Sequence, residues 1–252
     1  MGNAHAAEPE LPNLISFLAA KFNIAFLAEH IHFWEYVIFS LITVAVISLL
    51  AFFASRRSSF IPENRLQTAV ELIAGGLDDF ICGIIGPRGR KFTPFIGTLF
   101  IYILFMNLFG LIPFMKSSTS SLSTTFALAI CVFLYVQYTA FKELGFLGYL
   151  DHMSGKPRGM LAFSVFIPLM MFILHIVSEL VRPVSLALRL RSNVWGDDML
   201  MAVVAGFGIK GVPMLVFSTF LTIISSIVQA VVFCLLSTIY LALVMPHEEE
   251  IA

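Results

Sequence analysis

The apolar runs of this chain constrain its fold more than any other feature. A bilayer core about 30 Å thick needs about 20 consecutive apolar residues of helix, and the run from 33 to 54 already meets that length. Only 12% of the 252 residues are charged and 59% are hydrophobic, whereas soluble domains carry about 25% charged residues. So few polar groups cannot cover a globular surface. The sequence therefore predicts an integral membrane protein.

Five further helical segments follow the first span. They are predicted at 65–85, 92–115, 122–141, 160–207 and 212–245. The first of these is amphipathic, and it is predicted to lie on the membrane surface rather than to cross the bilayer. Its apolar residues recur at helical spacing: Leu66, Val70, Ile73, Leu77, Ile81 and Ile84.

The last two segments are too long for simple spans. As helices they would measure about 70 Å and about 50 Å, which exceeds the core thickness even at the usual tilts of about 20°. Either the first turns near Pro183 as two short spans, or both are long helices lying far from the membrane normal. A glycine-containing link at 206–211 joins them as a hairpin.

The fold class that follows is all-α and polytopic. We expect a single membrane domain over 1–252, with about five transmembrane helices and one interfacial helix. Residues 1–32 form a polar N-terminal tail. Cytoplasmic loops carry an excess of Lys and Arg, which places the N-terminus outside and the C-terminus inside. The basic residues that set this orientation are Arg56, Arg57, Arg88, Arg90, Lys91, Lys142, Lys156 and Arg158.

Charged residues inside the segment 160–207 require partners, because an ionised side chain at the bilayer centre is costly. Glu179 and Arg182 are three residues apart and meet on one helix face. They form either an ion pair that shapes the helix or part of a hydrated path. Arg189 has no acidic residue among its helical neighbours. Its partner is water, the facing helix or another chain, unless the side chain extends to the headgroups.

Arg191 points nearly opposite to Arg189, and Asp198 returns to the face of Arg191 about 10 Å further along. These two side chains either share a polar cavity, or Asp197 and Asp198 are solvated residues at a helix end. His175 lies close to the face of Arg189, where an imidazole could relay protons or be structural.

The last segment carries a polar stripe on an otherwise apolar helix. Its members are Ser218, Thr222, Ser225 and Gln229. Such hydroxyl groups either bond the helix backbone and join helices or line an aqueous path. Gln229 has the longest of these side chains and is predicted to face the arginine-bearing helix.

Neither a metal site nor a cofactor is predicted. The three cysteines are widely separated in apolar surroundings, as small buried side chains are. A metal site at the start of the first span is disfavoured, since interfacial histidines are ordinary there. The residues concerned are Cys82, Cys131 and Cys234, and His30, His32 and Glu35.

Several motifs, in order along the chain, resemble one known family. They are IPENRLQTAVE at 61–71, TPFIGTLFIYILFMNLFGLIP at 93–113, PVSLALRL with Asn193 at 183–193, and IVQAVVFCLLSTIYLAL at 227–243. Together these motifs resemble subunit a of the F-type ATP synthases, over most of residues 33–245.

The resemblance implies five crossings and a tilted hairpin packed against a rotating ring of c subunits. Arg189 is then the essential arginine facing the ring, with Gln229 nearby. The other partners implied are the peripheral stalk b subunits and membrane lipid, without nucleic acid, and the chain itself is not the catalytic part. A bacterial inner membrane follows, with a periplasmic N-terminus and a cytoplasmic C-terminus. The further candidates for two proton half-channels are Asp198, His175, Glu179, Asn193, Ser225 and Thr222.

The chain departs from the family pattern at several polar positions. Arg191 and Ser192 stand where an aromatic or small residue and a glycine are frequent. Asp198 stands where Glu or His is frequent, and His175 where Glu is frequent. The alternative function is a secondary transporter with a polar site at the midplane, although such folds usually show internal repeats and none is visible. A redox subunit would need haem ligands, and no paired histidines occur within the spans.

Overall fold

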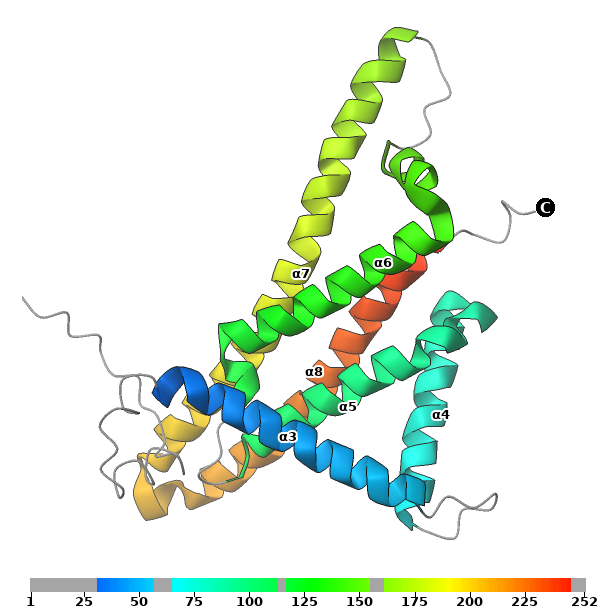
Figure 1. Cartoon of the computed structure of the whole chain (residues 1–252). Helices are drawn as coiled ribbons and strands as arrows, with labels where there is room; N and C mark the ends of the chain where they lie inside the picture. Colours follow the sequence, from blue (N-terminus) through cyan, green and yellow to red (C-terminus); the bar gives the residue numbers. More distant parts are fainter. Residues whose placement is uncertain (1–30, 57–64, 113–116, 155–160, 246–252) are drawn as a thin grey trace, which may run out of the picture.

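The computed structural model describes residues 31–56, 65–112, 117–154 and 161–245 (Figure 1). Within these ranges every regular element is a helix and no strand occurs. The α-helices are α3 (Ile31–Arg56), α4 (Arg65–Ile85), α5 (Thr93–Phe109), α6 (Leu122–Ser154), α7 (Leu161–Ala205) and α8 (Val212–Val244). Most of the predicted N-terminal tail lies outside the described residues.

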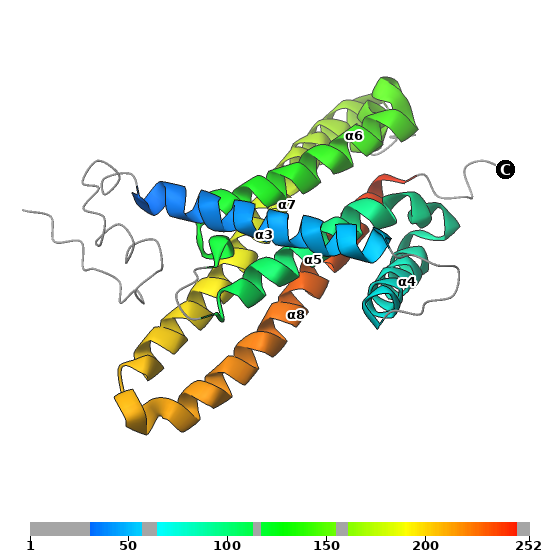
Figure 2. The same ribbon diagram turned by 60° about the horizontal axis from the view of Figure 1, so that its bottom comes forward.

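Five of these helices are long and apolar enough to cross a membrane. They are α3, α5, α6, α7 and α8, whereas α4 is not among them. The predicted all-α, polytopic membrane fold is therefore confirmed. In Figures 1 and 2, α4 lies at one end of the bundle and runs across the directions of α3 and α5.

The last two helices form a hairpin, which Figure 2 shows most clearly. α7 has 45 residues and α8 has 33, so α7 continues as one helix through Pro183 rather than as two short spans. A 3-10 turn, Gly208–Gly211, joins them. Gly208 has a φ of 60°, and a Cβ on Gly211 would lie 2.6 Å from the carbonyl oxygen of Val204. The hairpin turn therefore requires glycine at both positions.

The helix boundaries differ from the predicted spans at two places. α5 ends at Phe109, before the predicted limit of 115, because the chain turns back closely there. A Cβ on Gly110 would lie 2.9 Å from the Cβ of Ser117. α6 continues beyond the predicted limit of 141 to Ser154, with a break at Gly145, whose φ is 70°. The break redirects the last part of α6.

The buried core lies where α5, α6, α7 and α8 meet. Small residues allow the helix backbones to approach closely there: Ala129, Ala140, Ala187 and Ala230 are all at most 1% exposed. Larger side chains fill the remaining space, among them Ile96, Ile103, Leu190, Phe233 and Leu241. Membrane helices associate by such packing because lipid is as apolar as the side chains themselves. Many apolar residues accordingly face outward, as Leu41 and Val216 do.

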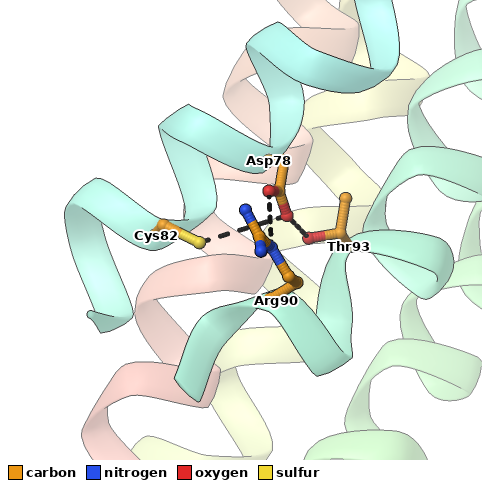
Figure 3. Close-up of polar contacts among 4 residues, drawn as sticks. All are labelled: Asp78, Cys82, Arg90 and Thr93. Atoms are coloured by element: carbon orange, nitrogen blue, oxygen red, sulfur yellow. Dashed lines mark hydrogen bonds and ion pairs between the residues drawn. The ribbon is translucent and has the colours of Figure 1, made fainter. Parts of the chain in front are cut away.

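Asp78 ties α4 to the start of α5 (Figure 3). Its carboxylate accepts a hydrogen bond of 2.7 Å from the Thr93 hydroxyl and one of 3.0 Å from Nε of Arg90. The thiol of Cys82 lies 4.0 Å from the same carboxylate. The Thr93 hydrogen bond, followed by those with Arg90, lowers the pKa of Asp78 below its ordinary value. We call these four residues the α4–α5 clamp.

Candidate functional site

A polar seam runs between the two helices of the hairpin. Nδ2 of Asn193 on α7 donates a 2.7 Å hydrogen bond to Oε1 of Gln229 on α8. One turn further along α7, the Asp197 carboxylate is hydrogen-bonded to the side chain of Ser225. A step of four residues along α7 thus corresponds to a step of four backwards along α8, as an antiparallel pair requires. Gln229 therefore faces α7, the arginine-bearing helix, as the sequence predicts.

Gln229 is almost fully buried, with 3% of its surface exposed. Its Oε1 is bonded to Asn193, but its Nε2 has no hydrogen-bond partner among the described residues. A buried amide N–H without a partner costs about 1–3 kcal/mol. The seam therefore presents one unused donor close to α7.

Arg189 lies on the outer side of α7, away from the core. Its flanking residues diverge: Leu190 is fully buried, whereas Leu188 is 48% exposed. Arg189 itself is exposed, and within the described ranges the structure gives it no hydrogen bond or ion pair. The hairpin thus presents an unpaired guanidinium on an exposed face of α7 that carries no other exposed charge among the described side chains.

Arg191 points to the opposite side of α7 and contacts the turn between α5 and α6. Its Nε donates a 3.4 Å hydrogen bond to the backbone oxygen of Ser120. The choice between a cavity shared by Arg191 and Asp198 and a solvated helix end stays a prediction. Arg191 is engaged by a turn, Asp197 by Ser225, and Asp198 is half-buried.

That turn is a buried polar cluster that the sequence does not reveal. The side chains of Ser117 to Ser120 are all at most 8% exposed. Thr119 donates to Oδ1 of Asn107 at 2.7 Å, its hydroxyl lies 2.6 Å from that of Ser117, and Ser118 donates to the backbone oxygen of Tyr36 at 2.7 Å. The density of Ser and Thr in this segment is the one sequence signal for the cluster, and it also fits an exposed loop.

Glu179 and Arg182 form the ion pair that their spacing predicts, at 2.7 Å. The structure adds two partners. Gln137 on α6 donates to the second oxygen of Glu179 at 2.6 Å, and the Arg182 guanidinium lies 5.1 Å from the ring centroid of Tyr240 on α8. A small cavity adjoins the pair, lined on its other sides by apolar residues of α6 and α7.

The remaining candidates have more ordinary surroundings. The Thr222 hydroxyl donates to the backbone oxygen of Ser218 at 3.1 Å, and Ser226 donates in turn to the backbone of Thr222 at 2.8 Å. Such bonds join polar side chains to their own helix. Ser226 is more deeply buried than Ser225, so the stripe is shifted by one residue at that turn. His175 is half-buried on α7, one turn before Glu179.

Within the described part of the chain, no group of three or more His, Cys, Asp or Glu side chains is arranged to hold a metal ion. The three cysteines are free thiols, of which Cys234 is buried and Cys131 is exposed. His30 lies outside the described residues, as do the side chains of His32 and Glu35. The predicted absence of a site at these three residues therefore stays a prediction.

Residues 37–242 match the family model described as ATP synthase A chain. The chain is 42% identical to "ATP synthase subunit a" of Protochlamydia amoebophila over 251 residues, which cover 96% of this chain and 92% of the relative. It is 34% identical to the protein of the same name from Solidesulfovibrio magneticus, with 84% of each chain covered. The relative from Bdellovibrio bacteriovorus is 32% identical over 85% of this chain and 93% of its own length.

These matches cover α3 through α8 and so include the polar seam and Arg189. The family resemblance drawn from the motifs is thereby confirmed. Together with the five helices able to span a membrane, the matches show that this multi-pass membrane protein belongs to the ATP synthase subunit a family.

Proposed function

We propose that this chain is the proton-translocating stator subunit of the membrane sector of a rotary ATP synthase. It works against a rotating ring of c subunits and is held by peripheral stalk b subunits, while ATP chemistry takes place elsewhere in the complex. Family membership supports this role. The observation that supports it most strongly is Arg189, an exposed cation on the outer face of α7 with no partner among the described residues.

The chemistry follows from the cost of burying charge. A protonated carboxyl group on the ring is neutral and moves through lipid, whereas an isolated carboxylate there is prohibitively costly. A cation within about 4–6 Å lowers a carboxyl pKa by about 1–3 units. The ring acid therefore releases its proton to the outlet path beside Arg189, stays ionised while paired with the guanidinium, and then takes a proton from the inlet path. Arginine suits this role because it keeps its charge.

The polar seam supplies neutral and acidic groups close to Arg189. Asn193 is one helical turn from Arg189, and Gln229, whose Oε1 is bonded to Asn193, has an amide nitrogen without a partner among the described residues. We propose that these two position the ring carboxylate or its water. The two half-channels are proposed to be lined by Asp198, His175 and the Asp197–Ser225 pair. The Thr222 hydroxyl, bonded to its own helix, is the weakest of these candidates.

The orientation is part of the proposal. Arg88, Arg90 and Lys91 stand at the start of α5, and Lys91 forms an ion pair with Glu143 near the end of the α6 span. These basic residues gather at one end of the helices, which the positive-inside rule places in the cytoplasm. We therefore propose a bacterial inner membrane protein with a periplasmic N-terminus and a cytoplasmic C-terminus. A secondary transporter loses its support, because the relatives are subunits of ATP synthases.

Replacing Arg189 tests the proposal. In membrane vesicles carrying the whole complex, we expect Arg189→Ala to reduce ATP-driven proton pumping by more than about 10-fold, since a pKa shift of one unit already corresponds to that factor. The control is Arg88→Ala, which removes an exposed arginine from the 3-10 turn before α5 and is expected to keep normal pumping. Normal pumping by Arg189→Ala would refute the proposal.

A further inference from the structure

Two arginines of α7 lie on nearly the same side of the helix. Arg182 and Arg189 are seven residues apart, which places them within about 20° of each other around the helix and about 10 Å apart along it. A carboxylate moving past this face would meet both cations if both were free. The structure treats them differently: Arg189 is exposed, whereas the side chain of Arg182 is only 19% exposed and pairs with Glu179.

Side chains from two other helices hold this pair in place. One oxygen of Glu179 accepts from Arg182 and the other from Gln137 of α6. The free end of Gln137 is also used, because its Oε1 accepts a 2.7 Å hydrogen bond from the Tyr149 hydroxyl. From α8, the ring of Tyr240 faces the Arg182 guanidinium. Both oxygens of Glu179 and both ends of the Gln137 amide therefore have a partner.

The bond from Tyr149 depends on the break in α6. In a continuous helix, residues 137 and 149 would be about 18 Å apart along the axis. The positive φ of Gly145 turns the last part of α6 back, so that the Tyr149 ring also packs against Phe141 with centroids 4.6 Å apart. The shape of α6 thus completes the hydrogen-bond chain that ends on Glu179.

We propose that Glu179 neutralises Arg182, with Gln137 and Tyr149 as positioning residues, so that a ring carboxylate meets Arg189 as the single uncompensated cation on this face of α7. This inference rests on the proposed function. Without Glu179, Arg182 would keep its charge, because a guanidinium does not deprotonate in proteins. It would then offer the ring acid a second counter-charge about 10 Å from Arg189 and hold the carboxylate ionised at the wrong position.

The test compares Glu179→Gln, Arg182→Gln and the double variant in vesicles that carry the whole complex. ATP-driven proton pumping is measured per assembled complex. We expect Glu179→Gln to lose at least about 10-fold in rate, the factor that one pKa unit represents. Arg182→Gln and the double variant should keep more than half of the wild-type rate. An unpaired Glu179 can take up a proton and become neutral, whereas an unpaired Arg182 cannot lose its charge.

The positioning role of Gln137 has its own signature. Gln137→Leu should lower pumping in the wild-type background but leave the double variant unchanged, since the pair that Gln137 orients is then absent. An equal effect in both backgrounds would contradict the positioning role, because it would show that Gln137 acts independently of the pair.

Two results would overturn the inference. One is normal pumping by Glu179→Gln. The other is a double variant as slow as Glu179→Gln, which would mean that Glu179 itself carries protons. If Glu179→Gln does not assemble, Arg182→Gln decides: a rate above half of wild type supports the inference, and a lower rate contradicts it. Arg189→Ala, run in parallel, separates this question from the proposed function, which fails only if that variant pumps normally.

Discussion

At the scale of single residues, the three arginines of α7 differ in how their charge is accommodated in a membrane helix. Arg182 has a carboxylate partner in Glu179, and Arg191 donates to the backbone oxygen of Ser120. Arg189 has neither kind of partner among the described residues and stands on the exposed side. A residue kept at such cost is a functional residue by default, and the missing partner is expected on another chain.

The hydrogen bond between Asn193 and Gln229 leads to a prediction at the same scale. Asn193→Leu removes the one described partner of the buried Gln229 amide, and leaving a buried polar group unpaired costs about 1–3 kcal/mol. We expect a lower thermal unfolding midpoint for the detergent-solubilised protein, measured by scanning fluorimetry.

The matched control for the seam is Ser192→Leu, a change of the neighbouring exposed residue, which should leave the midpoint unchanged. If Asn193→Leu and Ser192→Leu have the same effect, the hydrogen bond to Gln229 does not contribute to stability.

The sequence predicts those residue pairs that lie within one helix better than those between helices. The spacing of Glu179 and Arg182 is sufficient to predict their ion pair, because helix geometry is fixed. The Asp197–Ser225 and Gln137–Glu179 contacts depend on how helices are shifted along one another, and spacing carries no such information. Gln229 is the exception, because a long amide in an apolar helix has few possible partners.

At the scale of elements, local chemistry at helix ends decides where each helix sits. Glycines at 110 and 211 let the chain turn where a Cβ would collide, and the break at Gly145 redirects α6. Apolar run length predicts that these helices exist, but it does not predict their ends. The run after Phe109 is still apolar, for example, yet the helix ends there, where Ser117 lies close to Gly110.

The α4–α5 clamp gives a prediction for this scale. The pKa of Asp78 is lowered by the hydrogen bond from Thr93 and by Arg90. A depressed pKa means that the clamp stabilises the junction above the ordinary value of 3.8 and that this contribution is lost as the pH falls through the folded-state pKa. We expect hydrogen-exchange protection at the start of α5 to be unchanged at pH 6 and to fall as the pH drops below the ordinary value of 3.8.

Asp78→Asn should show reduced protection already at pH 6 and little further loss on acidification. Asp79→Asn, at the exposed neighbouring position, serves as the control and should follow the wild-type protein. Equal pH dependence in wild type and Asp78→Asn would show that another group is responsible.

At the scale of the whole molecule, the polar groups are divided between an interior and one outer face. The seam, the Ser–Thr turn and the Glu179–Arg182 network connect neighbouring helices, whereas the outer surface of α7 and α8 is mostly apolar. Among the described side chains of α7 and α8, Arg189 is the exposed charged residue on that surface, and its exposed polar neighbours Ser185 and Ser192 are uncharged. Such an arrangement suits a rotor whose acids stay neutral against lipid and become charged at one place.

The most direct measurement tests whether the face of α7 that carries Arg189 touches the ring of c subunits. A cysteine is placed on a c subunit, one helical turn from its carboxyl group, and paired with Leu188→Cys or Leu190→Cys. Leu188 is 48% exposed and Leu190 is fully buried, so they flank Arg189 on opposite sides. The native cysteines are first replaced by serine: Cys82, Cys131 and Cys234.

We expect oxidation to cross-link Leu188→Cys to the ring and to stop ATP-driven pumping until a reductant is added, while Leu190→Cys remains unlinked. A cross-link at Leu190→Cys as efficient as that at Leu188→Cys, or no cross-link at either position in the assembled complex, would contradict a rotor contact at Arg189.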